Sequence, residues 1–406
     1  MPFTLTGALL MDGSQAPAQG LLAVQGEKMD PAPARSLGLQ VEIPDGVVFP
    51  GLINACDSLL GSVLPRFGRG PYASRQAWEE ELKGSRAWDE LQKLSPEDRI
   101  LLGLYRQILS GVTTVFDPDW KVASLLAPDW RPIRIIEHFV RGHAFFPAMP
   151  LEGDDFSRLW KKAADEKAPF VVPVEEGTAK EVTQDVDYLH RRKALGKRTV
   201  LLHGVGCGPK NIEQCGHSSS HLVFCPSSEK FLYGRTADVP AFLKKGVSVS
   251  LGSDAPLAGG QALLEELKSA RDLARFDWKK GLDARELVGM VTTAPAKAFG
   301  LAKLAGRLAK GAPADITVVA RKKNADGWTS LVEAHVNDLH LVVAQGKPLL
   351  AKERYSALVK NSGVPGQKVS IHGEKYWLAG KPLDLKKRVE AALGAPPAWR
   401  FFPVGV

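Results

Sequence analysis

Ionisable side chains stand at the ends of several apolar runs in this sequence of 406 residues. Five of them follow runs rich in Val, Ile, Leu and Phe: Asp57, Asp117, Glu176, His203 and Asp254. Carboxylates and an imidazole that share a site can move protons to and from a reacting group, and both can ligate a metal ion. Because parallel strands of a barrel end at one mouth, the pattern predicts that these side chains gather there.

The apolar runs have the length of strands that are buried on both faces, and amphipathic segments separate them. Residues 74–94 and 95–111 have helical spacing, and Ser95 with Asp98 has the pattern of a capping box. Alternating strands and helices predict an α/β fold with a distorted (β/α)8 TIM-type barrel. The expected strands are residues 47–57, 111–117, 134–140, 170–176, 198–204, 220–226 and 247–254, with residues 143–149 as a short or irregular fourth strand.

Both ends of the chain have the sequence pattern of β-hairpins, with alternating apolar and polar residues between Gly-rich turns. This predicts a composite β-sandwich built from the N- and C-terminal segments beside the barrel. The expected regions are 1–46 and 305–350 for the two parts of the sandwich, 47–304 for the barrel, and 351–406 for a C-terminal extension with a hairpin and an amphipathic helix.

Composition excludes several classes of protein. Charged residues make up 24% and apolar residues 44% of the chain, as in folded globular proteins. The net charge of +8 forms no basic stripe, so we expect no nucleic-acid partner, and no apolar run is long enough to predict a membrane span. Cys56, Cys207, Cys215 and Cys225 form no CxxC pair, which predicts free thiols and a cytoplasmic protein.

The segment PGLINACDSLL (50–60) resembles the first barrel strand of the amidohydrolase superfamily, in particular the branch of cytosine deaminase and triazine chlorohydrolase. Further similar blocks follow in the family's order: GVTTVFD, VEEGTAKEV, VLLHGVG, FCPSSEKFLYG, VPAFLKKGVSVSLGSD, MVTTAPAKAFGL and GRLAKGAPADITVV. The resemblance implies the same barrel and sandwich. It also implies a hydrolase that acts on non-peptide C–N bonds of small cyclic or amidine-like compounds.

The resemblance assigns a role to each strand end. Family members hold zinc or iron, which lowers the pKa of a bound water to about 7, on two histidines of the first strand, one of the fifth, and an aspartate of the eighth. Those positions here are Cys56, Ser58, Pro173 and Asp254, and the first histidine of the chain is His138. Three of the four ligands are missing, so we expect no metal cofactor.

The groups that transfer protons in the family are retained. Glu176 matches the general acid/base glutamate and His203 the histidine that polarises water, which with Asp254 gives three candidate catalytic residues. The candidate substrate-binding residues are Cys56, Ser58, Phe224 and Glu229.

Three functions follow from these residues. The first is a hydrolase that is weak or inactive by the metal-hydroxide route. The second is a pseudoenzyme that binds a small molecule in the barrel mouth or acts as a scaffold, with a homo-oligomer possible. The third is an active hydrolase with a non-standard site. The last would use Cys56, Glu176, His203 and Asp254, as an unusual metal site or with Cys56 as nucleophile. The simpler interpretation makes Cys56 a buried apolar filler and the other three a structural polar network. His217 and His221 are expected on the surface.

Overall fold

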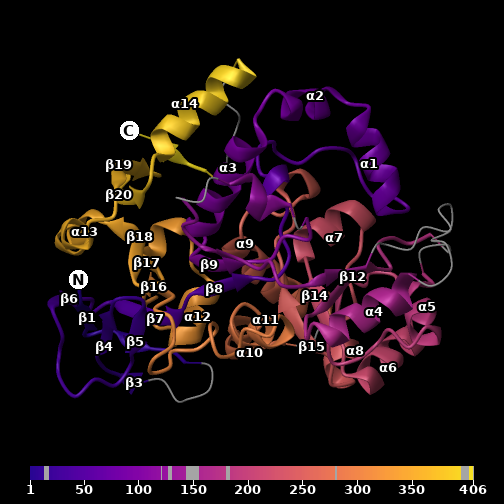
Figure 1. Ribbon diagram of the computed structural model, residues 1–406, viewed down its shortest axis with the longest axis horizontal. Coiled ribbons are helices and arrows are strands. Elements are labelled where there is room, and N and C mark those ends of the chain that lie inside the picture. The colour runs from indigo at the N-terminus through magenta and orange to yellow at the C-terminus, as the bar shows by residue number, and fades with distance from the viewer. Residues whose placement is uncertain are drawn as a thin grey trace.

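The computed structural model describes residues 1–12, 18–119, 121–126, 130–142, 155–179, 183–278, 281–394 and 402–405. The strand expected at residues 143–149 lies outside these ranges. Parallel strands in two sheets, in the orders β10-β9-β8 and β11-β12-β13-β14-β15, form the barrel near the middle of Figure 1. Their bounds are β8 (Leu52–Asn54), β9 (Val112–Val115), β10 (Arg134–Ile135), β11 (Val140–Arg141), β12 (Phe170–Val174), β13 (Thr199–His203), β14 (His221–Phe224) and β15 (Ser248–Leu251).

Hydrogen bonds join the first and last of these strands. The Ala55 amide donates to the Leu251 carbonyl at 3.0 Å, and Asp57 forms a parallel bridge with Asp254. Apolar side chains fill the space that the strands enclose, including Val171, Val223 and Phe299. The interior is therefore a packed core, as in other barrels of this kind.

Helices follow most strands and cover the barrel. The Ser95 hydroxyl accepts a hydrogen bond from the Asp98 amide at 3.1 Å and caps the third helix, as its sequence predicts. The helix expected over residues 74–94 is two helices, because Gly84 and Ser85 end the first and cap the second. The helices are α1 (Arg75–Lys83), α2 (Arg86–Gln92), α3 (Pro96–Ile108), α4 (Asp155–Asp165), α5 (Asp185–Arg191), α6 (Pro209–Ser218), α7 (Pro226–Tyr233), α8 (Val239–Lys244), α9 (Leu263–Asp272), α10 (Ala284–Gly289), α11 (Thr293–Ala298), α12 (Gly327–Val332), α13 (Ser356–Ser362) and α14 (Pro382–Leu393).

Strands from both ends of the chain form two further sheets beside the barrel (Figure 1). A four-stranded sheet has the order β5-β4-β1-β6, and a nine-stranded sheet has the order β21-β19-β20-β18-β17-β16-β7-β2-β3. Phe3, Leu22 and Val24 pack with Ile316 and Leu341 in one apolar cluster between them. The strands are β1 (Phe3–Thr6), β2 (Leu9–Leu10), β3 (Ala18–Gln19), β4 (Leu22–Gln25), β5 (Lys28–Asp30), β6 (Leu39–Glu42), β7 (Gly46–Pro50), β16 (Ile316–Ala320), β17 (Leu339–Ala344), β18 (Lys347–Lys352), β19 (Gly366–Ile371), β20 (Glu374–Ala379) and β21 (Val404–Gly405).

The apolar run 47–57 is two strands and not one, which corrects the sequence interpretation. Residues up to Pro50 belong to β7 of the nine-stranded sheet, where Phe49 pairs with Thr317, and only β8 enters the barrel. Gly51 separates them, and a Cβ atom there would collide with the Thr113 side chain. The glycine therefore lets the chain pass closely from the sheet into the barrel. The region boundaries at residues 46, 304 and 350 stay predictions. Within the described ranges, no helix is long and apolar enough to cross a membrane.

Candidate functional site

Three of the predicted residues stand together where barrel strands end. Glu176 follows β12, His203 ends β13, and the Glu176 Oε1 atom is 3.5 Å from His203 Nε2. Glu229 lies in α7, directly after β14, with its Oε1 atom 3.5 Å from His203 Nδ1. His203 is thus placed between two carboxyl groups. We call Glu176, His203, Glu229 and Asp254, together with Arg75, the strand-end cluster.

The backbone at these strand ends adopts an uncommon conformation. Glu175, His203 and Asp254 have φ angles of 52°, 71° and 49°, in the left-handed region that non-glycine residues seldom enter. Such backbone is costly and persists where the surroundings fix it, which is frequent at functional sites.

Neighbouring carboxylates determine the protonation state of His203. Burial alone would lower its pKa, but the carboxylates of Glu176 and Glu229 raise the pKa to about 10. Burial in turn raises the pKa of Glu229, and the neighbouring imidazolium opposes that shift. The Glu229 carboxyl also accepts hydrogen bonds from the Cys225 and Ala237 amides, at 2.9 and 3.0 Å. At neutral pH the imidazole is therefore protonated and acts as a donor.

Asp254, on the loop after β15, is an ion-pair partner. Its Oδ2 atom is 3.1 Å from Arg75 Nη1, and its Oδ1 atom accepts a hydrogen bond from the Ala255 amide at 2.7 Å. Burial would raise the pKa of Asp254, but Arg75 and His203 together lower it below its ordinary value. The carboxylate is therefore ionised, and a guanidinium group occupies one of its two oxygens.

Arg75 is the cluster residue that the sequence did not reveal. It begins α1, its guanidinium lies over the Trp78 ring at 4.6 Å, and its amide donates to the Glu176 carbonyl at 3.1 Å. Arg75 and Asp254 are 179 positions apart, and α1 reads as an ordinary amphipathic helix. No short-range signal in the sequence points to this contact.

Three other predicted residues have different surroundings. Cys56 is buried beside the cluster: its carbonyl accepts a hydrogen bond from the Asp254 amide at 3.0 Å, and its thiol lies within hydrogen-bonding reach of Cys225. Ser58 is half-buried, and its carbonyl accepts a hydrogen bond from the Gly61 amide at 3.1 Å. The Phe224 ring packs 5.8 Å from that of Trp278 in the apolar cluster that includes the helices, so the structure does not bring Phe224 to the strand-end cluster.

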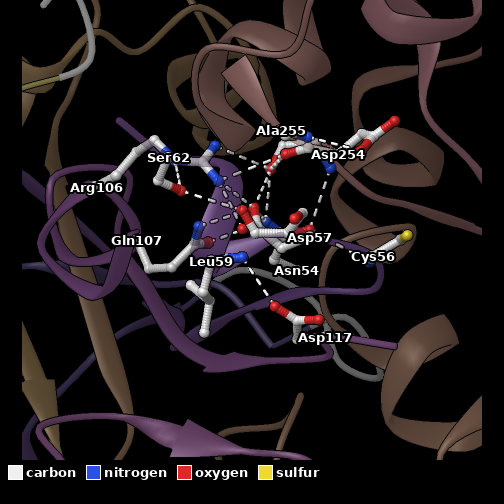
Figure 2. Close-up of polar contacts among 12 residues, drawn as sticks. Asn54, Cys56, Asp57, Leu59, Ser62, Arg106, Gln107, Asp117, Asp254 and Ala255 are labelled. Atoms are coloured by element: carbon white, nitrogen blue, oxygen red, sulfur yellow. Dashed lines mark hydrogen bonds and ion pairs between the residues drawn. The ribbon is translucent and has the colours of Figure 1, made fainter. Parts of the chain in front are cut away.

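Asp57 belongs to a buried network that adjoins the strand-end cluster, as Figure 2 shows, because Arg106 Nη2 also donates to the Asp254 carbonyl at 3.4 Å. Arg106 Nη2 is 2.6 Å from both carboxylate oxygens of Asp57, and Asn54, Gln107 and Ser253 donate to Oδ2 at 2.7 to 3.0 Å. In the figure Cys56 points away from this network, as expected for a neighbour on an extended chain. The network holds β8, α3 and the end of β15 together.

Two more ionisable residues differ from their expected roles. Asp117 accepts hydrogen bonds from the Leu59 and Asp119 amides at 2.8 Å, and burial raises the pKa of Asp117 to about 8. His221, expected on the surface, is buried at the start of β14, where burial lowers its pKa to about 4. His217, on α6, is exposed as expected.

Comparison with known proteins agrees with this geometry. Residues 164–349 match the model of the amidohydrolase family. A 5-methylthioadenosine/S-adenosylhomocysteine deaminase of Syntrophobacter fumaroxidans is 28% identical over 206 residues, 48% of this chain and 46% of that protein. The corresponding deaminase of Haloarcula marismortui is 24% identical over 69% of this chain and 74% of its own length. The chain spans less than half the length of the first of these two relatives.

Solved structures share the fold. An adenosine deaminase from Xanthomonas campestris with bound zinc superposes with a TM-score of 0.70 at 17% identity, over 96% of this chain and 98% of that one. Atrazine chlorohydrolase from Arthrobacter aurescens, complexed with zinc, has the same TM-score and identity over 88% of this chain and 99% of its own. These structures show that the chain has the TIM-type barrel of this superfamily, and residues 164–349 are similar to the amidohydrolase family, whose matching deaminases act on C–N bonds.

The same comparison corrects one expectation. We expected no metal cofactor, yet the matching chlorohydrolase and deaminase structures hold zinc, so the proteins that this chain resembles use a metal ion. In the part of the chain that the structure describes, however, no group of three or more His, Cys, Asp and Glu residues converges as metal ligands do. Cys56, Pro173 and an Asp254 that is paired with Arg75 do not fit the zinc site of four ligands, so no reaction step through a metal follows from these residues.

Proposed function

We propose that this protein binds a small cyclic or amidine-like nitrogen compound at the strand-end cluster, and that it hydrolyses C–N bonds weakly or not at all by the metal-hydroxide route. The observation that carries the proposal is the ion pair of 3.1 Å between Arg75 and Asp254. In the metal-hydroxide route that the resemblance implies, this aspartate is a metal ligand. Here its two oxygens are engaged by the Arg75 guanidinium and the Ala255 amide.

The protonation of His203 supports binding over turnover. Activation of water needs a base whose pKa lies near the working pH, whereas the pKa of His203 is about 10. The protonated imidazole and the guanidinium can donate hydrogen bonds to a ligand, and the partly exposed Glu176 carboxyl group can accept hydrogen bonds from it. This set complements a heterocycle that has ring nitrogen lone pairs and an exocyclic amino group.

The relatives narrow the class of ligand. Three of the four proteins reported above are named as deaminases of 5-methylthioadenosine and S-adenosylhomocysteine or of adenosine, all of which contain adenine. We therefore include purine nucleosides in the proposal. Four free cysteines among the described residues support a reducing, cytoplasmic location, and we propose neither a nucleic-acid nor a membrane partner.

The alternative with Cys56 as nucleophile has less support. The Cys56 thiol contacts Cys225, while both nitrogens of His203 face glutamate oxygens. A nucleophilic thiol needs an adjacent base that can take its proton, and an imidazolium with two carboxylate partners does not supply one.

Isothermal titration with adenosine and 5′-methylthioadenosine tests the proposal. The unmodified protein should bind at least one of them, and Glu176→Gln should weaken that binding about tenfold, because a hydrogen bond to a charged group is lost. Glu166→Gln is the matched control, since Glu166 is exposed and pairs only with Lys162 at 3.8 Å among the contacts described. Equal affinity of Glu176→Gln and the control, or no binding by the unmodified protein, would contradict the proposal.

A further inference from the structure

The strand-end cluster is almost closed to solvent. Asp254, His203 and Glu229 are 4%, 5% and 0% exposed. A compound of the size of a nucleoside therefore reaches these side chains only if part of the protein moves aside. Segments that open locally are those with few buried contacts, which is the feature to look for around the cluster.

The segment that leads from β8 into α1 has this feature. Every residue from 64 to 77 is exposed or half-buried, whereas Val63 before them and Trp78 after them are buried in the main apolar cluster. In Figure 1 the chain passes here from the barrel to α1 at the edge of the molecule. We call residues 64–77 the lid segment. Because its two ends are anchored, the stretch between them can move without exposing the core.

Backbone hydrogen bonds place the lid segment across the strand ends. The Phe67 amide donates to the Leu257 carbonyl at 3.0 Å, in the 3₁₀ helix that follows β15. Further along, the Ala73 carbonyl accepts from the Thr178 amide at 2.9 Å, in the loop after β12. The lid segment thus reaches from one strand end to the other, over the cluster whose carboxyl groups follow the same two strands.

A single ion pair joins the lid segment to the barrel among the described residues. It is the pair of 3.1 Å between Arg75 Nη1 and Asp254 Oδ2, whose side chains are 20% and 6% exposed. Water screens such a partly buried pair less than a pair on the surface, so it contributes more to closure. The Trp78 ring, 4.6 Å from the Arg75 guanidinium, keeps that group in position.

We propose that the lid segment closes the strand-end cluster and that the ion pair between Arg75 and Asp254 is its latch. The proposal rests on the proposed function for the role of the cluster as the ligand site, and it adds how access to that site is controlled. A ligand enters after the latch opens, and the freed Arg75 guanidinium then becomes available as a hydrogen-bond donor to it.

Hydrogen–deuterium exchange read by mass spectrometry tests the latch. In the unmodified protein, peptides from residues 64–77 should exchange faster than those from β13 and β14, because the lid segment opens without unfolding of the barrel. Arg75→Met should make the lid peptides exchange about tenfold faster, since a hydrogen bond between charged groups is lost. Peptides from β13 and β14 should keep their rates, which also shows that the variant is folded.

Two more variants separate the latch from a general effect of mutation. Arg86→Met is the matched control, since Arg86 is 92% exposed on α2 and should leave the lid peptides unchanged. Asp254→Asn should accelerate the lid peptides as Arg75→Met does, and the double variant should add little to either. Equal lid exchange in Arg75→Met and Arg86→Met, acceleration of the barrel strands together with the lid, or additive effects in the double variant would overturn the latch.

Alkylation by iodoacetamide, also located by mass spectrometry, tests whether the lid segment covers the site. Cys56 is 4% exposed beside the cluster, and Cys215, 0% exposed on α6, is the control thiol. Arg75→Met should speed modification of Cys56 about tenfold and leave Cys215 unchanged, and equal rates for Cys56 in both proteins would overturn the covering role. Both experiments omit ligand. Failure to bind nucleosides would therefore contradict the proposed function alone, and a slow lid would contradict only the latch.

Discussion

Replacement of Arg106 by methionine should strongly destabilise the fold. The guanidinium is 2.6 Å from both oxygens of Asp57, and the two side chains are 1% and 0% exposed. Without the cation, a carboxylate is left in the protein interior with only the neutral donors Asn54, Gln107 and Ser253. Loss of one partner of a buried ion pair costs about 3 to 5 kcal/mol, which sets the expected loss in the free energy of unfolding.

Urea-induced unfolding, followed by tryptophan fluorescence and far-UV circular dichroism, measures this loss. The double variant Arg106→Met with Asp57→Asn should be destabilised by less than the sum of the single variants, because it leaves no unpaired charge. Arg86→Met is the control, since Arg86 is 92% exposed and its ion pair with Glu90 lies on the surface. A loss for Arg106→Met of less than about 1 kcal/mol, or additive effects in the double variant, would refute the role of the pair in the fold.

Three further predictions concern single residues. An NMR titration of His203 should give a midpoint near 10, above the ordinary pKa of 6.5. The stabilisation by protonated His203 is therefore complete below pH 6.5 and is lost as the pH rises to about 10, so the difference in unfolding free energy between the unmodified protein and His203→Gln should shrink across that window. A difference that grows would contradict the ion pairs. His221 should change stability with pH in the opposite direction. Its pKa in the folded protein is lowered to about 4, so between pH 6.5 and 4 the unfolded chain binds a proton that the folded protein does not, and His221→Gln should reduce the loss of stability on acidification. An unchanged pH dependence would show that His221 is not buried as a neutral group. Gly51→Ala should lower the urea midpoint of unfolding, because the added Cβ atom would collide with the Thr113 side chain. Gly281→Ala is the control: its Cβ atom meets open space, so the midpoint should stay unchanged. Equal midpoints for the two variants would contradict the close passage of the chain between sheet and barrel.

Local patterns in the sequence predicted most of the barrel. The apolar runs of β12 to β15 are buried strands as expected, and Ser95 caps α3. The run 47–57 was predicted as one strand because an apolar stretch has the same pattern whether it belongs to one sheet or to two. Only Gly51 marks the division between β7 and β8.

The candidate site was predicted in part. Glu176, His203 and Asp254 lie at or just after the ends of strands that end on the same side of a parallel barrel, so their proximity follows from topology. Phe224 was misplaced because successive residues of a strand face opposite sides: Val223 and Cys225 pack inside the barrel and Phe224 packs toward the helices.

The ion pairs of Arg75 and Arg106 were not predicted. Arg75 meets Asp254 and Arg106 meets Asp57 only after the chain has folded, across 179 and 49 positions. No periodicity or capping signal carries such pairings, and these two arginines determine the charge around both aspartates. The chemistry of the site therefore depends on contacts that the sequence pattern does not show.

Release of ammonia from 5′-methylthioadenosine tests the central claim most directly, because it asks whether a cluster with Asp254 held by Arg75 turns a bound ligand over. The protein is supplied with zinc and nucleoside in excess of the protein, and ammonia and intact nucleoside are both quantified over time. The account predicts that the nucleoside is bound and recovered intact, with ammonia release at or near the rate without protein. Ammonia release over many turnovers, abolished in Glu176→Gln and retained in Glu166→Gln, would contradict it.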